Sequence, residues 1–128
     1  MKLLLLPLLF FSFCQEPETQ KVIYQGVASY YHQRFEGRQT SNGEIFSNEN
    51  LTAAHKTMPF GTIVKVTHLK NGNQVTVRIN DRLPLKSTRT IDLTVKAAKE
   101  LKMIKSGLAK VSIEVIEEPD MNPSDSVE

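Results

Sequence analysis

The chain has 128 residues and a formal net charge of +2 at pH 7. That length fits one small domain with short tails, and so small a charge gives no reason to expect nucleic acid as a partner. The sequence contains a single cysteine, Cys14, so an intramolecular disulfide is excluded and the core has to hold by packing alone.

The N-terminal residues have the composition of an export signal followed by a tether. Lys2 precedes an apolar run, residues 3–13, which is too short to span a bilayer but has the length of a signal-peptide core. Cys14 follows directly, at a position typical of the acylated first residue of a bacterial lipoprotein; an ordinary export signal with an incidental cysteine is the alternative. We expect a signal peptide over residues 1–14, lipidated at Cys14, and a tether over residues 15–21.

Order is expected to begin near residue 22. Residues 22–31 are rich in β-branched and aromatic side chains and predict a strand, in which Gly26 marks either a bulge or a close approach of two backbones. Residues 32–50 are polar and contain several glycines, which predicts a long loop. Long loops inside small domains are uncommon and often functional. For residues 51–55 we expect at most a short helical turn.

Two strands joined by a tight turn are predicted next. Apolar and polar residues alternate over residues 62–69 and again over residues 75–80, and an Asn-Gly pair between them favours a hairpin. The alternation continues to Asp81, so a carboxylate occupies the next inward position as the strand ends. Pro84 cannot donate to a ladder, so strand pairing is expected to stop nearby.

The C-terminal third predicts a short extended piece, a helix and a last strand. Asp92 or Thr94 is the expected cap of a helix that runs to about Met103. Alternation over residues 109–116 predicts the final strand, and the acidic residues 118–128 predict a disordered tail.

These elements belong to one mainly β domain over residues 22–117. At least five strands with long crossovers and one or two short helices favour a small β-barrel. The histidines His32, His55 and His68 are scattered and lack the spacing of a zinc motif, so we expect neither a metal nor a cofactor.

Asp81 is the residue best placed for chemistry. A carboxylate at the end of a rigid strand, next to the cationic Arg82 and a loop, suits a catalytic acid or base. The alternative is an Asn-Asp pair that starts a turn and bonds its own backbone.

Six motifs occur in order along residues 26–93: Gly26-Val-Ala-Ser-Tyr-Tyr31, Phe35-Glu-Gly-Arg-Gln-Thr-Ser-Asn-Gly-Glu44, Leu51-Thr-Ala-Ala-His-Lys-Thr57, Pro59-Phe-Gly61, residues 75–82 and Arg89-Thr-Ile-Asp-Leu93. As a set they resemble the rare lipoprotein A family, and the similarity extends over roughly residues 26–116. The resemblance implies a six-stranded double-psi β-barrel.

The resemblance also implies an exported protein of the cell envelope that acts in the periplasm, is lipid-anchored to a membrane and has peptidoglycan as its partner. We expect it to be a monomer. The implied activity is that of an endolytic lytic transglycosylase, which cleaves MurNAc–GlcNAc bonds in glycan strands without stem peptides and leaves 1,6-anhydroMurNAc ends. The alternative is a non-catalytic, expansin-like module that binds and loosens wall polysaccharide.

Carried onto this sequence, the functional residues of the family are Glu44, His55 and Asp81, and Asp92 matches an aspartate important in related barrels such as expansins. We expect Asp81 to act as acid and then base, because the C6 hydroxyl of the sugar replaces water as nucleophile. Glu44 and His55 are expected to orient Asp81 or the sugar, and Asp92 is the competing acid. The structural alternatives are a loop carboxylate bonding backbone N–H groups for Glu44, a hydrogen-bonded imidazole for His55 and a helix cap for Asp92.

The expected glycan contacts are Tyr30, Tyr31, Arg38, Asn42, Asn80 and Arg82. Tyr30, Tyr31, Phe35 and Phe46 suit a sugar-stacking floor, although aromatic residues at strand ends are more often part of a core. Leu83 departs from the family, which usually has glycine there, and this departure keeps the non-catalytic alternative open. Many members also carry a C-terminal peptidoglycan-binding domain. In this sequence we expect only the short acidic tail to follow the barrel.

Overall fold

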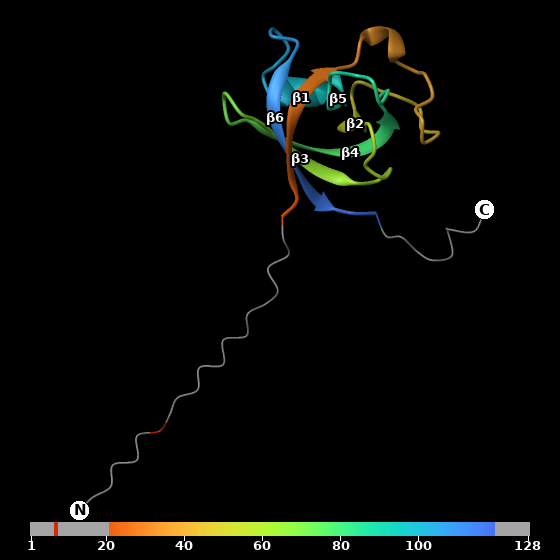
Figure 1. Ribbon diagram of the computed structural model, residues 1–128. Coiled ribbons are helices and arrows are strands. Elements are labelled where there is room, and N and C mark those ends of the chain that lie inside the picture. The colour runs from red at the N-terminus through yellow and green to blue at the C-terminus, as the bar shows by residue number, and fades with distance from the viewer. Residues whose placement is uncertain (1–6, 8–20, 120–128) are drawn as a thin grey trace, which may run out of the picture.

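Six strands close into a barrel in the order β1-β5-β2-β4-β3-β6 (Figure 1). The computed structural model describes Pro7 and residues 21–119, so the predicted signal peptide, the lipidation site at Cys14 and most of the tail lie outside the described residues. The elements are β1 (Ile23–Tyr30), the 3-10 helix η1 (Gln33–Phe35), β2 (Thr52–His55), β3 (Ile63–His68), β4 (Gln74–Arg82), β5 (Ile91–Leu93), α1 (Val95–Glu100) and β6 (Ala109–Glu117). The predicted six-stranded, mainly β barrel is confirmed.

The predicted hairpin is formed by β3 and β4. Val64 lies opposite Val77 and Val66 opposite Val75, so the alternating valines of both strands point into the barrel. Gly72 has a φ of 77°, in the left-handed region that glycine adopts without strain, and its N–H donates to the carbonyl of His68 at 2.8 Å. Local sequence therefore specifies this part of the fold.

The expectation for residues 51–55 was wrong, because β2 is a strand rather than a helical turn. It is buried along its whole length and lies between β4, to which it is parallel, and β5, to which it is antiparallel. A strand covered on both faces shows no polar alternation, and its two alanines carry a helical propensity that the neighbouring strands override.

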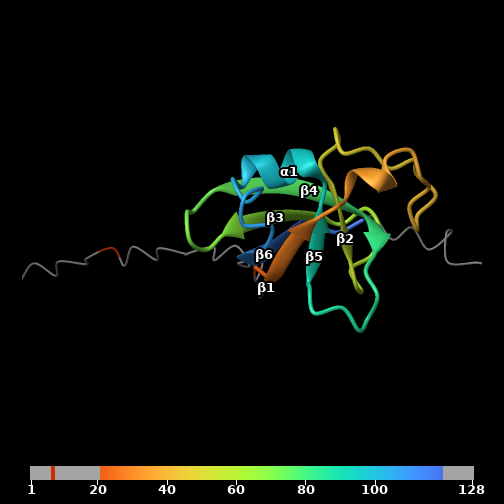
Figure 2. The same cartoon turned by 90° about the horizontal axis from the view of Figure 1, so that it is seen from above.

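The core consists of aliphatic side chains from the inner faces of the strands, completed by residues in and after α1. Ala97, Ala98, Leu101 and Met103 are all fully buried, and α1 packs against β4, β1 and β5 on one side of the barrel (Figure 2). The helix begins after Thr94, whose hydroxyl accepts the N–H of Ala97, and it ends at Glu100. The prediction of Asp92 as a cap was wrong, since Asp92 lies inside β5.

Gly26 marks a close approach of backbones rather than a bulge, because β1 pairs with β6 in regular register on both sides of it. A Cβ atom at position 26 would lie 2.1 Å from the hydroxyl oxygen of Thr90. Thr90 in turn connects to β1, since its N–H donates to the carbonyl of Val27 at 2.8 Å and its hydroxyl accepts the N–H of Val27 at 3.2 Å. This contact fixes the start of β5.

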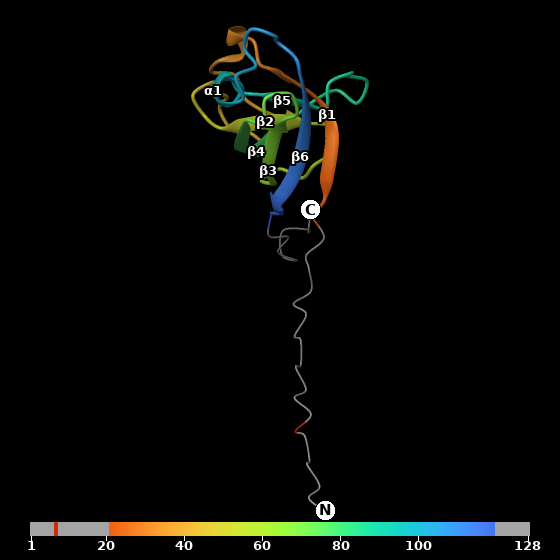
Figure 3. The same ribbon diagram turned by 90° about the vertical axis from the view of Figure 1, so that its left-hand side faces the viewer.

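The first and last strands are antiparallel neighbours, with Ile23 opposite Glu114. The described N-terminal and C-terminal segments therefore leave the barrel at the same end (Figure 3). Within residues 21–119, no helix has the length and apolar character needed to cross a bilayer.

The core predicts a strong contrast between adjacent positions of β4. Val77 is 1% exposed whereas Thr76 is exposed, so Val77→Asp buries an unpaired charge and should unfold the domain. Thr76→Asp, the matched control, should change the free energy of unfolding by less than about 0.5 kcal/mol. Circular dichroism during urea titration measures both; equal losses would contradict the assignment of the inner face.

The contact between Gly26 and Thr90 predicts an overpacking effect. Gly26→Ala should destabilise the domain by about 1–3 kcal/mol, and Thr90→Gly in the same chain should recover part of that loss by removing the clashing side chain. Thermal unfolding of the two single variants and the double variant measures the coupling. Strictly additive losses would show that the two positions do not compete for space.

Candidate active site

Two aspartates flank one alanine on a common face of the sheet. Ala54 of β2 pairs with Asp81 of β4 on one side and with Asp92 of β5 on the other, and Ser29 of β1 pairs with Asp92. Since neighbouring strands lie about 4.8 Å apart, the backbones of the two aspartates are separated by roughly 10 Å. Residues paired in register share a face, so the methyl group of Ala54 lies between two carboxyl groups.

A cleft of about 680 Å³ opens over this row of residues. One wall is the long loop after β1, including η1, and the other is the segment after β4; Figure 2 shows β1, β5, β2 and β4 between them. Tyr31 and Phe35 line the first wall, and Leu83 and Pro84 line the second. The cleft is therefore a groove with a polar floor and partly apolar sides, a shape that suits a polymeric sugar.

Asp81 is held by groups distant in sequence. Its Oδ1 accepts the N–H of Ser41 at 2.9 Å, the hydroxyl of Ser41 at 2.6 Å and the N–H of Arg82 at 2.9 Å, and its Oδ2 accepts the hydroxyl of Tyr31 at 2.6 Å. Burial raises the pKa of Asp81, but these hydrogen bonds outweigh it and leave the pKa below its usual value. Asp81 is therefore a carboxylate at neutral pH, and most of its partners are not those of a local turn.

The hydroxyl of Tyr31 stays protonated beside this carboxylate. Burial, followed by the hydrogen bond and the negative charge of Asp81, raises the pKa of Tyr31 far above its usual value. Tyr31 is packed between two rings, with centroids 4.3 Å from Phe46 and 5.9 Å from Phe35. The aromatic residues at this point thus form a packed cluster that aims one phenol at Asp81.

Asp92 is fixed by a cation and a hydroxyl group. Arg89 donates from Nε to Oδ1 at 2.8 Å and from Nη2 to Oδ2 at 3.1 Å, and Ser29 donates its hydroxyl to Oδ1. The side chain is only 8% exposed, so the bidentate ion pair with Arg89 compensates the carboxyl group for the water it has lost.

Glu44 lies outside the cleft and connects the long loop to β4. Arg78 donates to both of its carboxylate oxygens, at 2.5 and 2.8 Å, and the side-chain amides of Asn42 and Asn80 donate at 2.9 and 3.2 Å. The hydrogen bond from Arg78, which outweighs burial, lowers the pKa of Glu44 to about 2. All these donors are side chains, so the alternative of a carboxylate bonding backbone N–H groups was wrong.

His55 also lies away from the cleft. It follows Ala54 in β2, so its side chain points to the opposite face of the strand, where Nδ1 accepts the N–H groups of Thr57 at 3.1 Å and Met58 at 3.0 Å. Burial and the nearby charges of Arg82 and Lys56 lower its pKa. The structure therefore does not bring Glu44, His55 and Asp81 to a common point; it brings Asp81 and Asp92 together.

The predicted glycan contacts divide into two groups. Tyr30, Tyr31, Arg38 and Arg82 line the cleft. Asn42 and Asn80 instead belong to the cluster around Glu44, where Asn80 is buried.

Three residues of the site were missed from the sequence: Ser29, Ser41 and Arg89. Each lies in one of the ordered motifs, but Ser29 is 63 residues from its partner Asp92 and Ser41 is 40 residues from Asp81. Arg89 lies within reach of Asp92 along the chain, and that spacing is the one local signal that was available.

Leu83 fits the site without backbone strain. The φ angle of Leu83 lies outside the left-handed region. Among the described residues, Lys102 is the one non-glycine residue with a φ in that region. The side chain of Leu83 is 6% exposed and lines the cleft. The backbone at position 83 therefore does not require glycine in this chain. Beside Leu83, the carboxyl group of Asp81 makes four hydrogen bonds.

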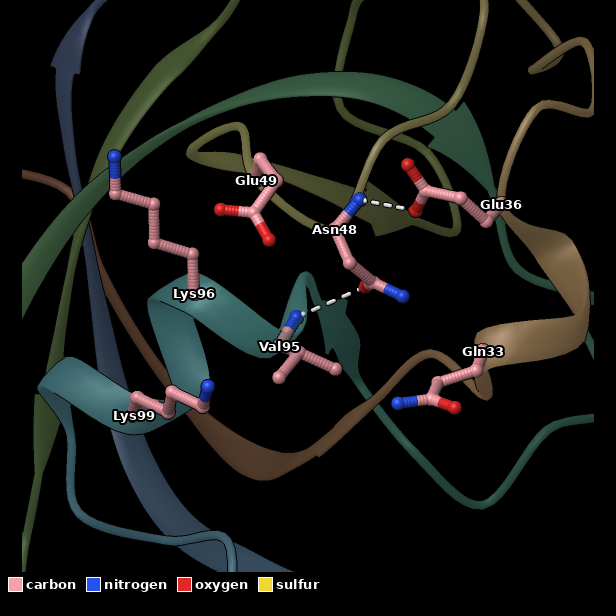
Figure 4. Close-up of a pocket in the computed structure, with 7 residues that line it drawn as sticks. All are labelled: Gln33, Glu36, Asn48, Glu49, Val95, Lys96 and Lys99. Atoms are coloured by element: carbon pink, nitrogen blue, oxygen red, sulfur yellow. Dashed lines mark hydrogen bonds between the residues drawn. The ribbon is translucent and has the colours of Figure 1, made fainter.

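A second hollow, of about 650 Å³, lies between the long loop and α1 (Figure 4). Glu36 accepts the N–H of Asn48 at 2.7 Å, and the side chain of Asn48 accepts the N–H of Val95 at 3.0 Å. These hydrogen bonds connect the loop to the start of α1, so the polar side chains around the hollow have a structural role. In the described residues no three acidic, histidine or cysteine side chains cluster as metal ligands.

Comparison with known proteins gives consistent results. Residues 23–113 match the lytic transglycolase family. The endolytic peptidoglycan transglycosylase RlpA of Campylobacter jejuni is 55% identical over 91 residues, which cover 71% of this chain and 33% of that protein. The protein of the same name from Haemophilus influenzae is 46% identical over 99 residues, covering 77% of this chain and 34% of the relative. The chain thus spans about a third of the length of these relatives.

Solved structures share the barrel at low sequence identity. An expansin of Clavibacter michiganensis superimposes with a TM-score of 0.59 at 19% identity, covering 77% of this chain and 52% of the expansin. A papain inhibitor from Streptomyces gives the same TM-score at 21% identity, covering 73% of this chain and 94% of the inhibitor. These similarities establish the fold, and the match over residues 23–113 shows that the chain belongs to the lytic transglycolase family, as its resemblance to rare lipoprotein A proteins predicted.

Proposed function

We propose that this protein is an endolytic peptidoglycan lytic transglycosylase, a lyase that cleaves MurNAc–GlcNAc bonds in glycan strands without stem peptides. The observation that carries this proposal is the pair Asp81 and Asp92 on either side of Ala54 at the floor of an open cleft. The names of the relatives, endolytic peptidoglycan transglycosylases, support it.

The reaction requires two proton movements at one sugar. The oxygen of the leaving GlcNAc must gain a proton, and the C6 hydroxyl of MurNAc must lose one as it attacks C1 and closes the 1,6-anhydro ring. No water is consumed, and one carboxyl group that first gives and then recovers a proton balances both steps. Asp81 takes this role, because it lies in the cleft and Tyr31 and Ser41 hold both of its oxygens.

Substrate binding favours the acid form that Asp81 needs at the start. Burial already raises the pKa of Asp81, and its hydrogen bonds oppose that effect. A glycan that displaces water from the cleft increases the contribution of burial and so raises the pKa further. Asp92, paired with Arg89 across the floor, stabilises the positive charge that develops at C1. Two carboxyl groups thus perform two roles because their surroundings differ.

We also propose that the protein acts in the cell envelope, exported to the periplasm and anchored through a lipid on Cys14. The apolar run before Cys14 and its length support export. A diacylglyceryl group with an amide-linked chain supplies the two or more acyl chains that stable anchoring requires. Glu44 and His55 are positioning residues in this proposal, Glu44 through the loop that carries Ser41.

Asp81→Asn is the test of the mechanism. The variant keeps the size of the side chain and one acceptor oxygen but cannot transfer the proton, so cleavage of purified glycan strands should fall by about two to four orders of magnitude, with folding and glycan binding retained. Mass spectrometry of the products distinguishes the 1,6-anhydro ends expected here from reducing ends, which are heavier by one water. Reducing ends would identify a hydrolase. No cleavage by the unmodified protein, with wall material loosened equally by Asp81→Asn, would support the expansin-like alternative.

The contact between Ser41 and Asp81 predicts a shift in a titration. Hydrogen bonds from Ser41 lower the pKa of Asp81, so Ser41→Ala should raise the pKa of Asp81. NMR of the side-chain carboxyl carbons of the aspartates, recorded against pH, measures this shift. Glu44→Gln should shift that pKa in the same direction, because the loop that carries Ser41 loses its ion pair with Arg78. Ser106→Ala, whose hydroxyl bonds the carbonyl of Met103 outside the cleft, is the control and should leave the titration unchanged. An unchanged pKa in Glu44→Gln would refute its positioning role.

A further inference from the structure

We infer that Arg34 and Arg38 bind free carboxylates of the glycan, so that the cleft selects an acidic polysaccharide. The ligand group is the lactyl carboxylate of MurNAc, which is ionised where no stem peptide is attached. This inference rests on the proposed function and names the feature of the substrate that the cleft recognises.

The cleft holds more cationic than anionic side chains. Arg34, Arg38, Arg82 and Arg89 line it together with Asp81 and Asp92. Arg89 is paired with Asp92, whereas none of the ion pairs within residues 21–119 involves the other three arginines. The guanidinium groups of Arg34 and Arg38 on the loop wall therefore have no carboxylate partner among these residues, and that is the arrangement expected where the ligand supplies the anion. Arg82 borders the cleft but pairs in register with His55, so its guanidinium group lies on the opposite face, over Phe60.

Aromatic rings hold these guanidinium groups in place. Arg34 and Arg38 both lie against Phe35, with their Cζ atoms 5.0 and 5.6 Å from the ring centroid, and Arg82 lies over Phe60 at 4.0 Å. A guanidinium group stacked on a ring keeps the N–H groups of its edge available, and that edge matches a carboxylate bidentately. The arginines are thus ordered before the ligand binds.

The position of the arginines relates them to the acid. Arg82 follows Asp81 in β4, and its Nη1 makes only long hydrogen bonds, at 3.4 and 3.5 Å, to backbone carbonyls. Arg34 and Arg38 lie on the opposite wall, and their shared ring, Phe35, packs against Tyr31, which donates to Asp81. A carboxylate on a MurNAc residue bound beside Asp81 would therefore meet the cations of the loop wall.

The chemistry of the substrate makes this arrangement selective. In strands without stem peptides each MurNAc carries a free carboxylate, whereas in peptide-bearing strands the same carbon is part of an amide and uncharged. Neutral wall polysaccharides carry no such group. Arginines that bind this carboxylate therefore favour strands without stem peptides over both alternatives.

Binding by the full chain with Asp81→Asn tests the inference without cleavage. The probes are purified stem-peptide-free strands and the same strands with their lactyl carboxylates converted to methylamides, compared by isothermal titration calorimetry. We expect methylamidation to weaken binding about tenfold, and Arg34→Gln with Arg38→Gln to weaken binding of the unmodified strands by a similar factor. The double variant should bind methylamidated strands no more weakly than the parent chain does.

The control variant removes the same charge elsewhere. Lys105→Gln with Lys110→Gln changes two exposed residues outside the cleft and should leave both affinities unchanged. Arg34 and Arg38 are themselves exposed, so their variants are expected to fold. A free stem peptide should not compete, because its carboxylates are not those recognised.

Equal affinity for unmodified and methylamidated strands would overturn the inference, as would competition by free stem peptide or an equal loss in the lysine control. Failure of the proposed function looks different. If the unmodified protein yields no anhydro products but discriminates between the two strands, the function fails and carboxylate recognition stands. If it cleaves both strands with the same kcat/KM, the function stands and the inference fails.

Discussion

The pairing of β2 with both of its neighbours is the constraint on which the site depends. This strand of four residues is parallel to β4 and antiparallel to β5, and it therefore closes the barrel and places both aspartates. The β2–β4 register shifts between Ala53 and Ala54, so that Ala53 lies opposite Ile79 while Ala54 lies opposite Asp81. A slip by one residue would turn every side chain of β2 to the other face; in one of the two directions it would bring His55 between the carboxyl groups.

The long loop after β1 is ordered by contacts that also hold Asp81 in place. Glu44 joins it to Arg78, Ser41 joins it to Asp81, and the ring of Phe46 packs on Tyr31. The loop side of each contact lies within residues 41–46, so this part of the loop is fixed to β4 and to Tyr31. A polar segment of this length loses much conformational entropy on ordering. The interactions that offset this loss also hold the carboxyl group of Asp81 in position.

The local sequence pattern predicted the structure correctly where the contacts are local, and it failed where the contacts join residues distant in sequence. The β3–β4 hairpin follows from alternation and an Asn-Gly turn. The same alternation predicted that Asp81 points inward like Val77 and Ile79, and that was wrong. β4 has one more residue than β2 at this point, so Ile79 pairs with Ala53 and Asp81 with Ala54, and Asp81 lies on the cleft face. β2 was missed because its alanines carry no strand signal and its burial depends on neighbours that are distant in sequence. Spacing alone left Asp92 and Thr94 as alternative helix caps. The structure has Thr94 as the cap, and Ser29 and Arg89 bind Asp92. Motif order identified the family, but only the register reveals which motif residues meet.

The antiparallel pairing of β1 and β6 has a consequence for how the domain is presented to its surroundings. The cleft lies over Ser29 and Tyr30, at the far end of β1 from Ile23, and Ile23 lies beside the end of β6. Over the 8 residues of β1 this separates the cleft from both exits of the chain by roughly 20 Å. A segment attached at either end of the described chain would therefore connect to the barrel at the end opposite the cleft. Such an attachment leaves the cleft accessible to an extended polymer.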